Sequence, residues 1–309
     1  MGKWDFRPSA LSLLSYSTTS SERLVEQYLK DNKRADEADV KIHARPESAF
    51  LRTLQWNIHG WTTATNDSSP VISKGIRDAI FNADADVVIL NEYDWENRDG
   101  RHIAFERNLR EQGYTFYCAT VFCPTAVATR LHVNEVREIR LSEERSALVL
   151  NVEQDLGSFW VIGTHLDHLN GQQRREEIDV LMQELELCCH DDDRIIMAGD
   201  LNQQRRQDYT KAEWKLISES MTRRKACQDD GVAVRLKKAR FVCAWDGLHP
   251  SKSNWATSKP PSTHWSGSVV DYSYGRNVQA DGVSVSKAGW SDHRMTVCDW
   301  KWTTRVLSN

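Results

Sequence analysis

The chain lacks the apolar run that a membrane-spanning helix requires. Nowhere do 18 apolar residues follow one another, and no apolar core of signal-peptide length comes after residues 1–5. The seven cysteines also lack the paired spacing of a zinc site. Scattered cysteines in an odd number are typical of reduced, buried thiols. These absences predict a soluble intracellular protein of the cytoplasm or nucleus, without a transmembrane segment.

An excess of basic charge is missing as well. Forty Lys and Arg residues face 44 Asp and Glu residues, which gives a formal net charge of -4 and a pI near 6.2. The whole molecule therefore has no general attraction to nucleic acid, although a local basic rim would still bind it. Internal repeats and low-complexity stretches are also absent. A hydrophobic fraction of 40% and 12 tryptophans are sufficient for a large core.

The chain divides into an extension and one larger domain. Residues 1–48 are predicted to form an N-terminal helical extension, and residues 49–309 the catalytic domain. Ser20 or Ser21 can cap a helix that begins at Glu22. Its apolar stripe consists of Leu24, Val25, Tyr28 and Leu29.

Strands alternate with a few helices through the domain. Short apolar runs predict strands at 51–56, 85–90, 115–122, 126–129, 136–141, 147–152, 159–163, 194–199, 268–274, 282–287 and 294–300. Helical periodicity covers residues 73–81, 172–189 and 211–221. Short connections within 114–152 favour antiparallel pairing. Residues 223–267 have little periodicity but much charge and aromaticity, so they form either a solvated loop or a basic, aromatic rim around a phosphate-binding cleft.

Polar side chains stand at or near the ends of many of these strands, some after a strand and some before one. They are Asn57 and His59, Glu92, Arg145, His165, Asp200 and Asn202, Asp271, and the triplet Ser291-Asp292-His293. A carboxylate at the end of a buried strand is costly without a partner, and a metal ion is the obvious candidate at Glu92. The period of two in an extended chain would send Asp200 and Asn202 to the same side.

The ordered motifs WNIHG, ILNE, GTHLDH, AGDLN, VVDYSY and SDHR resemble those of the endonuclease/exonuclease/phosphatase superfamily, which is deoxyribonuclease I-like. The resemblance covers residues 51–302. It implies an α/β protein with a four-layer αββα sandwich. Two mixed β-sheets would pack face to face with helices outside them, and the active site would lie at one rim.

The resemblance also implies a metal centre. Glu92 matches the principal metal ligand of the family, Asn57 the asparagine that helps to hold the metal shell, and Asp292 an auxiliary ligand. Oxygen ligands of this kind suit Mg²⁺ or Mn²⁺. Two departures concern this centre. His59 stands where many relatives carry an acidic residue, which suggests a single metal, and Asn91 replaces the usual glutamine before the metal-binding glutamate.

Catalytic roles follow from the same motifs. Asp200 resembles the group that orients and deprotonates the attacking water, and Asn202 resembles its partner that holds a phosphate oxygen. His293 would pair with Asp271, which fixes the tautomer of the ring. Whether Asp200 or His293 is the general base stays open.

Two further groups are implied to bind the substrate. His165 resembles the family histidine that donates to a non-bridging oxygen, and Arg145 stands where relatives place a phosphate-contacting Arg or Tyr. His168 has no family counterpart and is equally compatible with a structural role.

Three hypotheses for function remain. The first is a divalent-metal-dependent phosphodiesterase whose substrate is nucleic acid or a nucleic-acid adduct. The second is a phosphoesterase for a small or lipid-like phosphate of the inositol phosphate or sphingomyelin type. The third is the family fold repurposed for binding or non-hydrolytic chemistry. The sequence does not define an oligomeric state.

Overall fold

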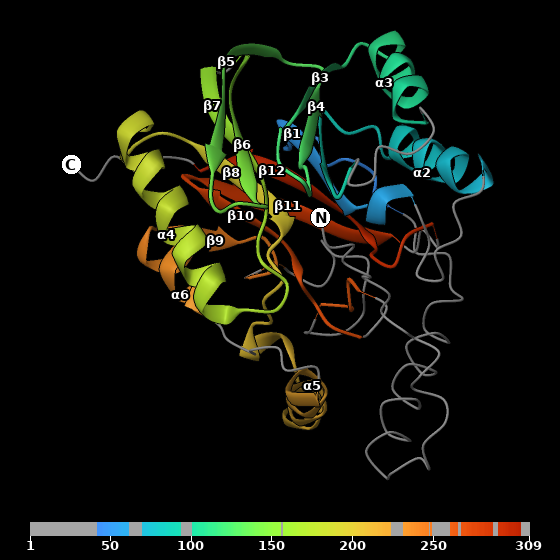
Figure 1. Ribbon diagram of the computed structural model, residues 1–309. Coiled ribbons are helices and arrows are strands. Elements are labelled where there is room, and N and C mark those ends of the chain that lie inside the picture. Colours follow the sequence, from blue (N-terminus) through green and yellow to red (C-terminus); the bar gives the residue numbers. More distant parts are fainter. Residues whose placement is uncertain are drawn as a thin grey trace.

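The computed structural model describes residues 42–61, 70–93, 101–155, 157–223, 231–246, 248, 260–264, 267–286 and 290–303. The predicted helix that begins at Glu22 lies outside these residues. Within the described part, two β-sheets of six strands each pack between helices (Figure 1).

The first sheet joins strands from both ends of the domain, in the order β11-β12-β1-β2-β4-β3. These strands are β1 (Leu51–Asn57), β2 (Val87–Asn91), β3 (Thr115–Cys118), β4 (Ala126–Thr129), β11 (Val278–Ser286) and β12 (Met295–Trp302). Strand β1 runs parallel to β2, and Asn57 lies opposite Asn91. Because parallel strands end at the same edge of a sheet, Asn57 and the residue after Asn91, which is Glu92, arrive at one edge.

The second sheet has the order β5-β6-β7-β8-β10-β9. Its strands are β5 (His132–Arg140), β6 (Ser146–Gln154), β7 (Gly157–His165), β8 (Ile195–Asp200), β9 (Val242–Cys243) and β10 (Asp271–Arg276). Parallel pairing of β7 with β8 places His165 opposite Asp200. Antiparallel pairing of β10 with β8 places Asp271 opposite Asp200 from the other side. This register gathers three titratable side chains at one strand end.

Apolar residues fill the space between the sheets. Strands β1, β2 and β8 are buried along their whole length, as expected for strands covered on both faces. The facing side chains include Val87, Ile89, Val127, Leu148, Leu150, Val161 and Ile196, which belong to one buried cluster. At Gly163 an added Cβ would lie 2.9 Å from the Val127 side chain, so the two sheets approach closely there.

Helices cover the outer faces of both sheets. Helices α2 (Pro70–Ala83) and α3 (Arg101–Glu111) pack on the first sheet through side chains such as Ile76, Ile80, Phe105 and Leu109. Helices α4 (Gly171–Cys188) and α6 (Gly231–Lys238) pack together on the second sheet, and α5 (Lys211–Arg223) contacts the same cluster (Figure 1). Two single turns, η2 (His59–Trp61) and η3 (Arg206–Asp208), complete the described helices. The predicted four-layer sandwich is confirmed.

The local predictions were wrong at several points. Helix α3 was not predicted, since only two side chains of its charged sequence, Phe105 and Leu109, enter the core. The predicted loop over 223–267 contains α6, whose eight residues bury only Val232 and Leu236. The strand predicted to reach residue 122 ends at Cys118. Short helices that are held by tertiary packing leave little periodic signal in the sequence.

The segment directly before β1 contacts the first sheet. The backbone N–H of His43 donates to Ser284 Oγ at 3.0 Å, and Arg45 pairs with Asp86 at 2.9 Å. Residues 42–48 therefore pack on the first sheet, while a boundary after residue 48 stays a prediction. None of the six described cysteines forms a disulfide bond. Among the described residues no helix is long and apolar enough to cross a membrane.

Candidate active site

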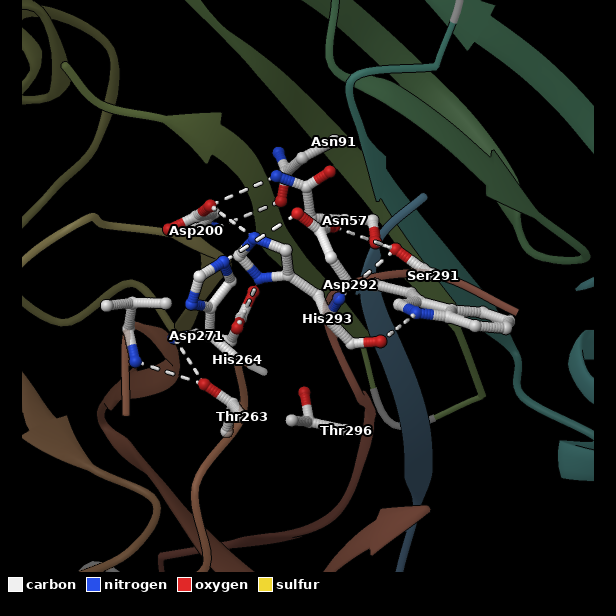
Figure 2. Close-up of polar contacts among 12 residues, drawn as sticks. Asn57, Asn91, Asp200, Thr263, His264, Asp271, Ser291, Asp292, His293 and Thr296 are labelled. Carbon is white, nitrogen blue, oxygen red and sulfur yellow. Dashed lines mark hydrogen bonds and ion pairs between the residues drawn. The ribbon is translucent and has the colours of Figure 1, made fainter. Parts of the chain in front are cut away.

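Nearly all of the predicted polar side chains meet where β1, β2, β7 and β8 end and where β10 and β12 begin. Figure 2 shows Asn57, Asp200, Asp271, Asp292 and His293 among them. The sheets contribute from opposite sides of the same rim. Asn57, Glu92, Asp292 and His293 come from the first sheet and its loops. His165, Asp200, Asn202 and Asp271 come from the second sheet.

Asn57 joins Glu92 to Asp200. Its amide nitrogen donates to Glu92 Oε1 and to Asp200 Oδ2, both at 3.0 Å, and its Oδ1 accepts the backbone N–H of His59. The last contact fixes the orientation of the amide, so its nitrogen faces both carboxylates. Glu92 itself has a φ of 53°, a left-handed conformation that costs free energy in a non-glycine residue. Such strain is concentrated at functional sites.

Asp271 and His293 form a buried hydrogen-bonded pair. His293 Nδ1 lies 2.8 Å from Asp271 Oδ2, and the opposite ring nitrogen, Nε2, lies 3.6 Å from Asp200 Oδ2 (Figure 2). A carboxylate oxygen accepts hydrogen bonds, so the proton of this contact belongs on Nδ1 of His293. The Nε2 atom is therefore the one that faces Asp200.

Asp292 lies between two imidazole rings. Its Oδ1 is 3.9 Å from His59 Nδ1, and its Oδ2 is 3.7 Å from His264 Nε2. The ring of His264 also packs edge-on against that of His293, with centroids 4.7 Å apart. The sequence did not identify His264, because it stands in the aperiodic region 223–267. An isolated β-bridge between His264 and His293 brings it to the site.

His165 connects Arg145 with Asn202. Its Nδ1 lies 3.5 Å from Arg145 Nη1, and its Nε2 lies 3.1 Å from Asn202 Nδ2. The predicted extended path through Asp200 and Asn202 was wrong: β8 ends at Asp200, and Asn202 has a φ of 49°. Asn202 Nδ2 also donates to the Leu166 carbonyl, which holds the turned side chain beside His165.

The buried side-chain amides of Asn91 and Gln55 form a second set of hydrogen bonds behind these groups. Asn91 Oδ1 accepts the backbone N–H of Asp200 and the Nε2 of Gln55, and Asn91 Nδ2 donates to Thr125 Oγ1 and the Thr164 carbonyl. Gln55 was not predicted as a site residue. The period of two along β1 places it on the same face as Asn57, and that pattern would have revealed it.

Burial and neighbouring charges shift the pKa values of the central acid and base in the same direction. Burial raises the pKa of Asp200 to about 7, and the nearby His293 opposes that rise. Burial alone would lower the pKa of His293, but the charges of Asp271, Asp200 and Asp292 outweigh burial and raise this pKa well above its usual value. Asp200 is thus poised to exchange a proton near neutral pH, beside a cationic imidazole.

His165 and Asp292 both have lowered pKa values, but for different reasons. Burial, with added repulsion from Arg145 and His293, holds the pKa of His165 well below its usual value, so this ring is neutral. Burial would raise the pKa of Asp292, but His293, His264 and His59 outweigh it and hold this pKa well below its usual value. Asp292 therefore stays ionised and is available to a cation.

The donor atoms fit a divalent metal ion. Two groups of described side chains are close enough to share one, namely Asp200 with Asp271 and His293, and Asp292 with His264 and His293. The Glu92 carboxylate adds a partly exposed oxygen that is fixed by Asn57. Carboxylate oxygens suit Mg²⁺ or Mn²⁺, and histidine nitrogens close by are acceptable to Mn²⁺.

The basic rim considered for residues 223–267 stays a prediction, but two of its described basic residues form ion pairs within the protein. Arg235 pairs with Asp179 of α4 at 2.7 Å, and Arg240 pairs with Asp191 at 2.5 Å. Asp191 precedes the first residue of β8, whereas Asp200 is the last residue of that strand. The Arg235 pair therefore joins the two outer helices α6 and α4, and the Arg240 pair lies towards the opposite end of the second sheet from Asp200. Trp245 contacts the core clusters, and Arg223 to Lys225, Trp255 and Trp265 lie outside the described side chains.

Comparison with protein families gives one match. The model of the endonuclease/exonuclease/phosphatase family matches residues 54–293, which include every site residue discussed above. The chain belongs to this family. Members of the family, as its name says, hydrolyse phosphate esters. No curated protein matches the chain.

Solved structures of the endonuclease/exonuclease/phosphatase fold resemble the chain at low identity. The human Nocturnin catalytic domain with bound sulfate is 18% identical and has a TM-score of 0.63, over 84% of this chain and 97% of that one. TDP2 of D. rerio complexed with single-strand DNA product is 16% identical with a TM-score of 0.56, over 81% and 98%. The mannosyl-6-phosphatase of Bacteroides thetaiotaomicron is 14% identical with a TM-score of 0.60, over 82% and 100%. At these identities the likeness concerns the fold alone.

Proposed function

We propose that this protein is a divalent-metal-dependent phosphodiesterase that hydrolyses its substrate with an activated water. The observation that carries the proposal is the buried carboxylate of Asp200, whose pKa is raised by burial to about 7. It stands 3.6 Å from His293 Nε2 and is bonded to the same amide as Glu92. A general base works best when its pKa lies near the working pH.

Phosphodiesters resist hydrolysis because their negative charge repels a nucleophile. Glu92 and Asp292 are the groups that would hold Mg²⁺ or Mn²⁺, with Asn57 fixing the Glu92 carboxylate. When bound, the cation neutralises charge on the phosphoryl oxygens and on the leaving oxygen. The site residues are left with two tasks, to orient the phosphoryl group and to handle the proton of the water.

Asp200 accepts that proton in the proposed mechanism. Its Oδ1 is held by the backbone N–H of Asn202, and its Oδ2 faces both Asn57 and His293. The cationic ring of His293 beside it stabilises negative charge that develops on the phosphoryl group, and Asp271 keeps that ring protonated on Nδ1. If His293 is instead the base, Asp200 fixes its orientation. The pH dependence of variants at the two positions distinguishes these assignments.

Arg145, His165 and Asn202 would bind the phosphoryl oxygens. The neutral ring of His165 lies between the other two side chains, within hydrogen-bond distance of both, so the three form one polar cluster. Arg145 is 5% exposed, so a substrate can reach its guanidinium only with a group that enters the site. This arrangement supports phosphate binding within the site and leaves the rest of the substrate to the surrounding loops.

The first substrate candidate is nucleic acid or a nucleic-acid adduct. TDP2 of D. rerio, a protein of similar fold, has been solved with single-strand DNA product. A small or lipid-like phosphate ester is the second candidate. It is favoured by the ion pairs of Arg235 with Asp179 and of Arg240 with Asp191, which neutralise two basic residues that the first candidate would use. A protein of similar fold is a mannosyl-6-phosphatase.

Hydrolysis of bis-p-nitrophenyl phosphate in Mg²⁺ or Mn²⁺, with chelator as the control, tests the reaction. We expect turnover that stops on chelation and is absent in Asp200→Asn. A panel of single-stranded DNA, duplex DNA, RNA, an inositol phosphate and sphingomyelin vesicles then separates the two substrate candidates. No turnover of any substrate with either metal would contradict the proposal and favour a protein that binds phosphate without hydrolysing it.

A further inference from the structure

Gln55 lies beneath the site at the centre of a hydrogen-bond network that no motif assigns. It is a residue of β1 and is 1% exposed. Its Nε2 donates to Asp271 Oδ1 at 2.8 Å and to Asn91 Oδ1 at 3.1 Å, and its Oε1 accepts from Thr296 Oγ1 at 3.0 Å. All of these partners are buried.

The partners leave one orientation for the Gln55 amide. Both hydrogens of Nε2 are used, one on the Asp271 carboxylate and one on the Asn91 carbonyl oxygen. Rotating the amide by 180° would place Oε1 against the Asp271 carboxylate, which has no hydrogen to donate when ionised. The network is fully satisfied only as it stands, and a buried network of this kind tolerates no loss of a donor.

Each acceptor of Gln55 also holds one reacting group. The second oxygen of Asp271 bonds to His293 Nδ1 at 2.8 Å. Asn91 Oδ1 receives the backbone N–H of Asp200 at 3.0 Å. Gln55 Nε2 therefore bonds both to Asp271, which orients His293, and to Asn91, which holds the backbone of Asp200.

The network also crosses between the sheets. Gln55 and Asn91 belong to the first sheet, while Asp271 and Asp200 belong to the second. The separation of 3.6 Å between His293 Nε2 and Asp200 Oδ2 thus depends on how the two sheets are placed relative to each other. Apolar packing between sheets sets their spacing, but it does not specify a side-chain orientation as hydrogen bonds do.

We propose that Gln55 is a positioning residue that aligns His293 with Asp200 by bonding at once to Asp271 and Asn91. The proposal rests on the proposed function for its effect on turnover. Its effect on the Asp271–His293 hydrogen bond is independent of any reaction. Gln55 touches no substrate in this role.

The test compares Gln55→Met with Gln154→Met. Methionine keeps the length of the side chain and loses the donor. Gln154 is a matched control, since its Nε2 also donates a hydrogen bond, at 2.8 Å, to the Phe50 carbonyl. Gln154 lies at the opposite end of the second sheet from Asp200. The first readout is the proton nuclear magnetic resonance signal of His293 Nδ1–H, which resonates far downfield when bonded to a buried carboxylate and is assigned by its loss in His293→Gln. The second readout is kcat and KM for bis-p-nitrophenyl phosphate.

We expect Gln55→Met to shift or broaden the downfield signal and to lower kcat about tenfold or more, with KM changed less than about twofold. Gln154→Met should leave both readouts as in the wild type. An unchanged signal together with unchanged kcat in folded Gln55→Met would overturn the proposal and leave Gln55 as a packing residue.

Gln55→Glu covers the case in which Gln55→Met does not fold. It is isosteric with glutamine and still accepts from Thr296, but it presents an oxygen to Asp271. We expect it to perturb the downfield signal at least as strongly as Gln55→Met. A wild-type signal in Gln55→Glu would overturn the proposal. If the wild-type protein hydrolyses no phosphoester, the proposed function fails while the signal still decides the role of Gln55.

Discussion

His293 Nδ1 lies 2.8 Å from Asp271 Oδ2, inside the protein and away from water. The pair joins the start of β10 to the loop that leads into β12, so it also links the two sheets. Because the Asp271 charge is the main influence that opposes burial at His293, removing this charge must lower the pKa of the ring.

Asp271→Asn tests that dependence. We expect kcat to fall by about 100-fold or more, since the ring loses both its charge and its fixed tautomer. The titration of the His293 ring, followed by nuclear magnetic resonance, should move to lower pH. Retention of wild-type kcat in Asp271→Asn would remove this pair from the mechanism.

The activity should rise as pH increases through about 7. Burial raises the pKa of Asp200 to about 7, and below this pH the carboxyl group carries a proton and cannot accept another from water. A bound cation favours the ionised carboxylate, so the rising limb of the pH–rate profile should move to lower pH as Mg²⁺ concentration increases. Asp200→Asn should have no measurable turnover, and therefore no rising limb in its pH–rate profile. A profile that is flat between pH 5 and 8 would contradict the assignment.

The same shift affects stability with a definite sign. The pKa of Asp200 is higher in the folded protein than its ordinary value of 3.8, so the folded protein binds the proton more tightly. This contribution is fully present below the ordinary pKa and is lost as pH rises through about 7. In metal-free buffer the free energy of unfolding should therefore fall over this range less steeply for Asp200→Asn than for the wild type. Urea titrations at several pH values measure the difference, and equal slopes for the two proteins would contradict it.

Glu92→Gln should weaken divalent-metal binding. Glutamine keeps the size of the side chain, and its oxygen can still meet Asn57 Nδ2, but the negative charge is lost. We expect the Kd for Mg²⁺ or Mn²⁺ to rise at least about tenfold in calorimetric titrations. Mg²⁺ should raise the Tm of the wild type, because a ligand of the folded state stabilises it, and should raise the Tm of Glu92→Gln much less. Equal affinity in both proteins would place the metal elsewhere.

Gly199→Ala should damage the site through its backbone. A Cβ at this position would lie 1.8 Å from the Thr164 carbonyl oxygen, which also accepts from Asn91 Nδ2. We expect a loss of about 3 kcal/mol in the free energy of unfolding, measured by urea denaturation, and reduced kcat. Gly113→Ala is a control: its Cβ would meet no atom within 4 Å, and its φ of +84° alone should cost about 1 kcal/mol. Similar losses in the two variants would show that the contact at Gly199 is relieved.

Much of the fold was accessible from the sequence because its signals are local. The apolar runs that became β1, β2 and β8 are buried on both faces, and such strands stand out between polar ends. Helices α3 and α6 were missed because each places only two side chains in the core, and the rest of each sequence faces water. These helices are stabilised by contacts with the sheets, and the sequences of the helices alone do not predict those contacts.

The sequence by itself determined which side chains stand at strand ends, since a polar residue directly after a buried run must lie at a sheet edge. For this reason the sequence predicts Asn57, Glu92, His165 and Asp200 as site residues. His293 was predicted as well, at the entrance to a strand. Only the tertiary structure decided which of them touch. The left-handed turn at Asn202, the arrival of His264 beside His293, and the Gln55 amide between the sheets depend on contacts between residues far apart in the sequence. Such contacts follow from how two sheets pack, and no periodicity along one strand encodes them.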